Sequence, residues 1–271
     1  MARLLITGAA GLLGQELAER LAPDWNLTLF DLVRAPERGG ARILVGDMGD
    51  PADVTAAVQG ADAILHLACR HGENVTFEET LDANYRGSIA LMDAAVANGV
   101  SHVVFASSNH GWGLYPRTAA PLAADAPPRP DGWYGINKIW TEAMLSFYAD
   151  TRGLTATSLR IGNCGASVPD ERRTHMWISF DDLAALTTLA LTRQGPGHRA
   201  VFATADCAAP FFDNSGAKAI GFTPQHHPED HLDHPGVASE AAGTDIFGRS
   251  IGGSYAAANF RADIDIWERA E

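Results

Sequence analysis

The sequence has 271 residues, 46% of them hydrophobic, so it can bury one substantial core and is not a small disulfide-stapled scaffold. Its formal net charge of -13 makes the average surface field repel phosphate backbones and anionic lipids, which argues against nucleic acid and membrane surfaces as partners. The three cysteines, Cys69, Cys164 and Cys207, lack disulfide or metal-ligand spacing, and we interpret them as buried small hydrophobic residues in a reducing compartment.

The first apolar strand pattern, at residues 3–7, runs directly into a glycine turn. It leaves no room for the basic segment, apolar core and cleavage site of a signal peptide. No uninterrupted apolar run approaches the roughly 20 residues that a membrane helix needs. The sequence therefore predicts a cytoplasmic protein.

Apolar strand patterns alternate with helical patterns along the first 160 residues. Strands are expected at residues 3–7, 27–30, 63–67, 102–106 and 155–161, and helices at 14–21, 52–58, 77–97 and 134–151. Such alternation, with nearly continuous apolar strands, predicts an α/β fold with a Rossmann-type, doubly wound parallel sheet and helices on both faces.

After residue 161 the patterns weaken, because Gly, Pro, His and Asp interrupt them between residues 163 and 175 and again between 224 and 248. Only a helix at 180–192 and a short strand near 200–203 stand out. We interpret the chain as a single domain, 1–271. Within it, residues 1–161 form mainly the core, and residues 162–271 form mainly a small C-terminal lobe and the sheet edge.

Three glycines, Gly8, Gly11 and Gly14, follow the first strand immediately and open the first helix. In that context backbone amides at a helix N-terminus can approach a pyrophosphate closely. The second strand ends at Asp31, near the expected distance for a carboxylate that accepts hydrogen bonds from an adenosine ribose. The combination predicts a dinucleotide site.

A carboxylate at Asp31 repels the 2′-phosphate of NADP and favours NAD, although Arg34 and Arg38 lie close by in the sequence. A further carboxylate, Asp47, follows an additional short strand expected between the strand at 27–30 and the helix at 52–58. It is either a hydrogen-bond partner of the adenine amino group or an ordinary turn residue.

Tyr134 and Lys138 are four residues apart, which on a helix puts a phenol and an ammonium on one face. The ammonium lowers the pKa of the phenol, so that the phenolate can remove a proton from a substrate hydroxyl while a hydride leaves the same carbon. Ser108 ends a strand, where its hydroxyl can hold the substrate oxygen beside the phenol. Taken alone, the Tyr and Lys pair also fits an exposed helix face.

These motifs together resemble the extended short-chain dehydrogenase/reductases, also called the NAD-dependent epimerase/dehydratase family, over most of the first 190 residues. The resemblance is carried by residues 7–14, 66–68, 107–108, 134–138 and 180–182 and by Asn84. It implies that NAD is the cofactor and that Ser108, Tyr134 and Lys138 are catalytic. It also implies that Lys138 holds the nicotinamide ribose and that Asn84 supports a proton relay.

A narrower likeness, to the uronate dehydrogenases, spans nearly the full length. It rests on residues 105–110, 129–135, 160–164 and 213–215, on Arg172 with Trp177 and Ser179, and on Gly252-Gly253. It implies oxidation of the anomeric hydroxyl of a hexuronate to an aldaric acid lactone, with Ser108, Asn109 and His110 touching the sugar. Arg172 then binds the sugar carboxylate, because a guanidinium fork pairs with it bidentately.

Two positions differ from that family's sugar contacts. His71 falls near the place of a family serine, in a segment that is one residue longer here, and Asn163 replaces a second serine. The full set of candidate residues follows. Cofactor-binding candidates are Gly8, Gly11, Leu12, Leu13, Gly14, Asp31, Leu32, Asp47, Met48, Leu67, Ala68, Asn84, Tyr134, Lys138, Ile161 and Cys164. Substrate-binding candidates are His71, Ser108, Asn109, His110, Asn163, Arg172 and Tyr255, with no metal.

Some features have a plain structural explanation. Arg172 and its neighbour Arg173 also fit solvated cations of an irregular Pro- and Asp-containing loop, and His110 also fits a capping residue. The histidines at 226, 227, 231 and 234 lack a metal-ligand spacing, and we interpret their segment as a solvated surface.

The runner-up function is a nucleotide-sugar epimerase or dehydratase, or a dehydrogenase of another sugar, on the same core. Only 110 residues follow residue 161, whereas such epimerases carry a larger C-terminal substrate domain. A third possibility is a protein that senses NAD without turnover, against which the intact set of Ser108, Tyr134 and Lys138 argues. The resemblance also implies a homodimer or higher homo-oligomer, built on apolar outer faces of the helices at 77–97 and 134–151.

Overall fold

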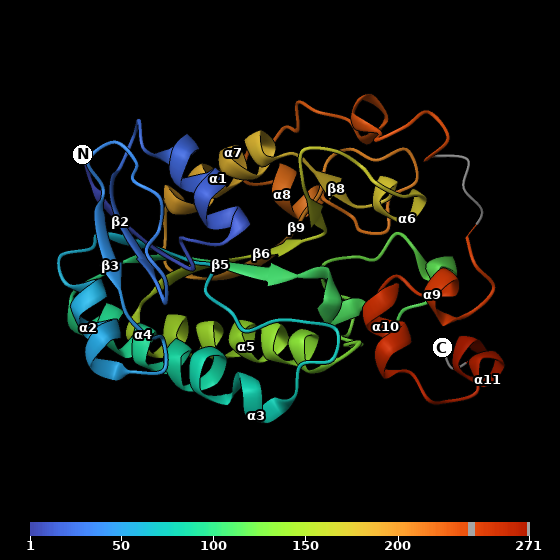
Figure 1. Ribbon diagram of the computed structural model, residues 1–271, viewed down its shortest axis with the longest axis horizontal. Helices are drawn as coiled ribbons and strands as arrows, with labels where there is room; N and C mark the ends of the chain where they lie inside the picture. The colour runs from blue at the N-terminus through green and yellow to red at the C-terminus, as the bar shows by residue number, and fades with distance from the viewer. Residues whose placement is uncertain (238–241, 270–271) are drawn as a thin grey trace.

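The computed structural model describes residues 1–237 and 242–269. Its central element is one parallel sheet (Figure 1). Its seven strands lie in the order β3-β2-β1-β4-β5-β6-β9. They are β1 (Arg3–Thr7), β2 (Asn26–Asp31), β3 (Arg42–Val45), β4 (Ala63–His66), β5 (His102–Ser108), β6 (Thr155–Ile161) and β9 (Gly197–Ala203). The chain runs outward from β1 to β3 and then returns to β4, so the strand order reverses between β1 and β4. The expected Rossmann-type fold is confirmed, and ligands of such sheets bind at this reversal.

Helices cover both faces of the sheet (Figure 1). On one face lie α1 (Leu12–Leu21), α7 (Phe180–Leu191) and α8 (Ser215–Lys218); on the other lie α2 (Pro51–Val58), α4 (Gly87–Ala97) and α5 (Trp133–Arg152). Successive residues of a strand point to opposite faces. Accordingly, Leu4 and Ile6 of β1 pack in the hydrophobic cluster with α1 and α7, whereas Leu5 packs in the cluster with α2 and α4.

The helix expected at 77–97 contains an interruption. A capping box between Thr76 and Glu79 begins α3 (Phe77–Thr80). A π-helical turn (Leu81–Arg86) follows without a break and leads directly into α4. A π-turn inserts a residue into a helix and re-aims the side chains near it, often at functional sites. Asn84 lies inside this turn, which periodicity alone did not predict.

The C-terminal segments pack beyond the carboxyl end of β5, where α9 (Ile246–Arg249) and α10 (Ser254–Asn259) lie (Figure 1). This region also contains a pair of short parallel strands, β7 (Asn163–Cys164) and β8 (Trp177–Ile178), and the helix α11 (Ile264–Arg269). Short 3-10 turns lie at Asn109–Trp112, Arg117–Ala119 and Pro228–His231. Phe212 and Ile251 share one hydrophobic cluster with Trp112, so this part of the chain packs directly on the core.

Two expectations were wrong in detail. Arg172 does not lie in an irregular loop: it belongs to α6 (Glu171–Thr174), which the Asp170 side chain caps, and it is buried. The three cysteines are free thiols, but each is partly exposed rather than buried, since each lies on a strand end or loop. Among the described residues, no helix is both long and apolar enough to cross a membrane.

Candidate active site

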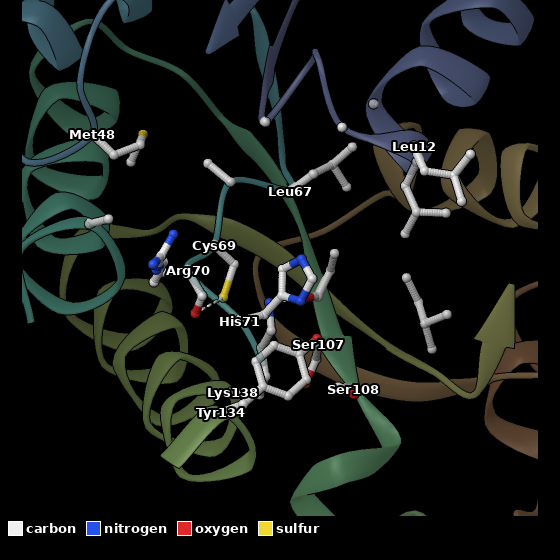
Figure 2. Close-up of a pocket in the computed structure, with 18 of the residues that line it drawn as sticks. Leu12, Met48, Leu67, Cys69, Arg70, His71, Ser107, Ser108, Tyr134 and Lys138 are labelled. Carbon is white, nitrogen blue, oxygen red and sulfur yellow. Dashed lines mark hydrogen bonds between the residues drawn. The ribbon is translucent and has the colours of Figure 1, made fainter. Parts of the chain in front are cut away.

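A cavity of about 720 Å³ lies at the carboxyl ends of the central strands. In Figure 2, Tyr134, Lys138 and Ser108 gather at one end of it, and Leu12 and Met48 lie toward the other. All the candidate residues from the sequence line this cavity except Asn84 and Arg172. The carboxyl ends of parallel strands lie at one edge of the sheet, which explains why residues from widely separated stretches of sequence meet here.

The glycine turn after β1 leaves no room for side chains. Gly8 has a φ of +73°, a left-handed conformation that favours glycine, and a Cβ there would lie 2.6 Å from the Ala68 amide nitrogen. A Cβ on Gly14 would overlap the Gly8 carbonyl oxygen. The Asp31 carboxylate accepts a hydrogen bond from the Ala10 amide at 2.9 Å and so fixes the turn from β2. This bare backbone at the start of α1 fits the pyrophosphate of NAD.

The end of the cavity beside β2 and β3 combines apolar and acidic groups. Leu32 directly follows Asp31 of β2, and Leu12 begins α1; both line the cavity and are 63% exposed, so they offer apolar surface to a ligand. Asp47 uses one carboxylate oxygen to accept a hydrogen bond from the Gly49 amide at 2.7 Å, as a turn residue does, and Met48 is buried beside it. The adenine end of a dinucleotide matches this combination.

The opposite end holds the hydroxyl, phenol and ammonium. Ser108 terminates β5, and its oxygen accepts a hydrogen bond from the His110 amide. Tyr134 and Lys138 lie in the first turns of α5, and the Lys138 Nζ lies 5.2 Å from the centre of the Tyr134 ring. Nζ also donates a hydrogen bond to the Ala106 carbonyl at 2.7 Å, which anchors this buried ammonium to β5.

Burial raises the pKa of the Tyr134 phenol well above its ordinary value, with Cys69 and Asp131 adding to the rise and a hydrogen bond with Ser108 opposing it. The lowering expected from Lys138 is therefore not the dominant effect in this structure. Loss of hydration penalises the phenolate more than the neighbouring groups stabilise it.

Ser107 also lines the cavity beside Ser108, but its hydroxyl is already engaged. Its hydroxyl donates to Glu142 at 2.5 Å, and Glu142 is held in turn by Arg160 at 2.8 Å. The Arg160 guanidinium stacks 3.9 Å from the Trp112 ring centre. Ser107, Glu142 and Arg160 thus connect β5, α5 and β6 through buried hydrogen bonds beside Ser108. No local pattern in the sequence indicated this network.

Aromatic rings and amides form the side of the cavity nearest the C-terminal segments. Tyr255 of α10 stacks on His110 with ring centres 3.9 Å apart, and His71 lies 6.1 Å from Tyr134. Asn163 also lines the cavity. Asn109 lines it with its amide nitrogen donating to the sulfur of Met176.

Arg172 does not line the cavity, although it lies close to the C-terminal segments that do. Its Nε donates to the Ile251 carbonyl at 2.7 Å, and one guanidinium nitrogen, Nη2, is buried without a hydrogen-bond partner among the described residues. Burial lowers its pKa to about 10, so the group remains charged at neutral pH. A buried cation with an unused donor is costly unless an anion reaches it.

Asn84 also lies outside the cavity lining, and both ends of its side-chain amide are occupied. Oδ1 accepts from the Arg70 amide at 2.7 Å, and Nδ2 donates to the Arg70 carbonyl at 2.8 Å. In this structure Asn84 therefore fixes the backbone that carries His71. Cys69 and Arg70 line the cavity as well, and no motif in the sequence indicated either of them as a site residue.

Two of the C-terminal histidines make structural contacts. His226 bonds with the Ser179 hydroxyl at 3.0 Å, and the His231 ring stacks on Trp177, so this segment is more closely packed than expected. Within residues 1–237 and 242–269, no three potential ligands gather as a metal site.

Comparisons with known proteins agree with this geometry. The model of the NAD-dependent epimerase/dehydratase family matches residues 4–182. The chain is 39% identical over 230 residues to a uronate dehydrogenase of Pseudomonas syringae pv. tomato, covering 84% of this chain and 83% of the relative. A variant of uronate dehydrogenase from Agrobacterium tumefaciens, solved in complex with NAD, superposes with a TM-score of 0.88 at 35% identity over 95% of this chain and 97% of that one. A glucuronic acid dehydrogenase from Chromohalobacter salexigens gives 0.88 at 30% identity over 94% and 97%.

Proposed function

The chain belongs to the NAD-dependent epimerase/dehydratase family, and we propose that it uses NAD to oxidise the anomeric hydroxyl of a hexuronate to an aldaric acid lactone in the cytoplasm. One observation carries the proposal. Ser108, Tyr134 and Lys138 gather at one end of a cavity whose other end is a bare glycine turn beside Asp31. The likeness to uronate dehydrogenases supports the substrate class.

The reaction removes a proton and a hydride from one carbon. The Ser108 hydroxyl orients the anomeric hydroxyl, the Tyr134 phenolate takes its proton, and the lactone carbonyl forms as the C–H bond breaks. NAD, when bound, accepts the hydride. Lys138 holds the nicotinamide ribose and stabilises the phenolate against the cost of its burial.

The other cavity residues divide between the two ligands. Gly8, Gly11 and Gly14 would hold the pyrophosphate, and Asp31 the adenosine ribose. The remaining cofactor contacts would come from Leu12, Leu13, Leu32, Asp47, Met48, Leu67, Ala68, Ile161 and Cys164, all of which line the cavity. The sugar contacts would come from His71, Asn109, His110, Asn163 and Tyr255, with Arg172 on the carboxylate. Residues 1–161 would thus serve mainly NAD, and residues 162–271 mainly the substrate.

The test is to follow NADH formation across free aldoses, hexuronates and nucleotide-sugars. We expect turnover of one or more hexuronates and little of the matching neutral aldoses. Conversion of nucleotide-sugars without net NADH formation, detected by NMR of the products, would favour an epimerase or dehydratase, because those enzymes regenerate NAD. NAD binding with no turnover of any sugar would indicate a sensor.

NAD should bind at least about tenfold more tightly than NADP. The Asp31 carboxylate stands where NADP brings a phosphate, and juxtaposed like charges cost several kcal/mol. The two nearby arginines already face carboxylates, since Arg34 pairs with Glu37 at 3.1 Å and Arg38 with Glu19 at 3.8 Å. Fluorescence titration of both cofactors measures the ratio, and equal affinities would contradict the role of Asp31.

We also expect at least a homodimer. Trp133, Ile136 and Phe147 form an apolar stripe on the outer face of α5 and are 43%, 37% and 55% exposed. Their spacing places them on one side of the helix. Light scattering at micromolar concentration should give at least twice the chain mass, and Phe147→Glu should shift it toward the monomer. Ile266→Glu, on the exposed side of α11, is the matched control, and a monomeric parent would contradict the proposal.

A further inference from the structure

We propose that Asp131 is a positioning residue that holds the His110 ring with Nδ1 protonated and Nε2 turned to a sugar oxygen in the cavity. The inference deepens the proposed function and rests on it for the identity of the ligand. Asp131 lies within the stretch 129–135 that carries the narrower family likeness, but the sequence assigned it no role. It lies in the loop before α5, three residues ahead of Tyr134.

The geometry of the pair favours one tautomer of His110. Nδ1 of His110 lies 2.7 Å from Oδ2 of Asp131, whose side chain is completely buried. An ionised carboxylate only accepts hydrogen bonds, so the shared hydrogen belongs to Nδ1. The Asp131 amide also donates to the His110 carbonyl at 3.2 Å, which ties the two residues together through the backbone.

Two glycines make room for the Asp131 carboxylate, because a side chain at either position would overlap it. A Cβ on Gly113 or on Gly252 would overlap Oδ2 of Asp131. These two glycines are joined by a hydrogen bond from the Gly252 amide to the Gly113 carbonyl at 2.8 Å. The other carboxylate oxygen, Oδ1, is buried without a hydrogen-bond partner among the described residues. Among the described residues, the Asp131 carboxylate therefore makes its one side-chain hydrogen bond to His110, while its charge also acts on Arg172, Tyr134 and Tyr255.

Aromatic contacts hold the plane of the imidazole. Tyr255 stacks on it at 3.9 Å, and Tyr134 meets it edge to face at 5.7 Å. With the ring plane held, the imidazole can still flip by a half-turn, which would exchange the positions of its two nitrogens. The hydrogen bond from Nδ1 to Asp131 opposes that flip. Nε2 makes no hydrogen bond to the part of the chain that the structure describes, and His110 lines the cavity beside Tyr134. A carboxylate behind a histidine that faces a ligand sets which ring nitrogen meets that ligand.

The first test reads the ring directly. Nitrogen-15 NMR of the full-length protein, with the His110 signals assigned by their loss in His110→Gln, should show hydrogen on Nδ1 without any sugar present. A bare Nδ1 with hydrogen on Nε2 would overturn the inference. This readout does not depend on turnover, so it separates a failure of the positioning role from a failure of the proposed function.

The second test uses kinetics with a matched control. Asp131→Asn keeps the shape but also offers an amide donor to Nδ1, so kcat/KM for the hexuronate should fall roughly 10- to 100-fold, mainly through KM, with the Kd for NAD unchanged. Asp125→Asn removes the same charge from an exposed site in the same loop and should change neither constant.

A double-mutant comparison separates positioning from stability. In a His110→Gln background, Asp131→Asn should cost almost nothing further in kcat/KM, because the partner that it orients is gone. An undiminished loss in that background, or an equal loss in the Asp125→Asn control, would overturn the proposal.

Discussion

Replacing Tyr134 with phenylalanine should abolish nearly all turnover while leaving the fold and NAD binding intact. The change deletes one oxygen atom, and removing a general base typically slows a reaction on the order of 100- to 10000-fold. The aromatic ring that packs beside His110 and Tyr255 remains. Single-turnover NADH formation and an NAD titration measure the two effects separately.

The control for this variant is Tyr115→Phe, which removes a phenolic oxygen that bonds the Pro127 carbonyl outside the cavity. That variant should keep the parent rate. Activity of Tyr134→Phe within a few-fold of the parent would refute the assignment of the base.

The pH profile of the parent enzyme follows from the same residue. Because burial raises the pKa of Tyr134, most of the enzyme holds a neutral phenol near pH 7. The reactive form is the phenolate, so kcat/KM should increase as the pH rises above 7. This alkaline limb should be absent from the residual activity of Tyr134→Phe.

Replacing Arg172 with alanine should raise KM for a hexuronate strongly. Its unpartnered Nη2 is a buried donor, and removing one partner of a desolvated charge pair costs about 2 to 5 kcal/mol. Arg172→Lys should recover only part of the loss, since an ammonium keeps the charge but not the bidentate fork. The matching neutral aldose has no carboxylate to lose and should be affected far less.

Stability must be measured alongside these kinetics. A solvated loop cation could be replaced by alanine without loss of stability, but Arg172 is buried and donates a hydrogen bond to the Ile251 carbonyl. A loss of about 1 to 3 kcal/mol in the free energy of unfolding is expected. Arg173→Ala, on the same helix turn, is the control. If both sugars slow equally in Arg172→Ala, Arg172 is not the carboxylate ligand, although the dehydrogenase assignment stands.

The sheet and the cofactor end of the cavity could be predicted because their signals are local. Each of these features can be recognised from a few neighbouring residues: the apolar strand at 3–7, the glycines that follow it, and Asp31 at the end of β2. The substrate end could not be predicted in the same way. Asp131 meets His110 across 21 residues, and Arg172 is fixed by a carbonyl far along the chain at Ile251. Such pairs depend on tertiary packing, which no periodicity records.

The sheet also has a consequence for how the chain acquires its structure. Within the described residues, no strand pairs with its sheet neighbour through a hairpin: Leu4 pairs with Ala63, and Thr155 with Gly197. Each pairing must close a long loop before it gains any stability, which puts refolding on the slow side for a domain of this size. During synthesis the edge of β6 stays unpaired until the ribosome has released β9. A nascent chain that stalls before Ala203 therefore exposes an open strand edge, the feature through which partly folded chains aggregate.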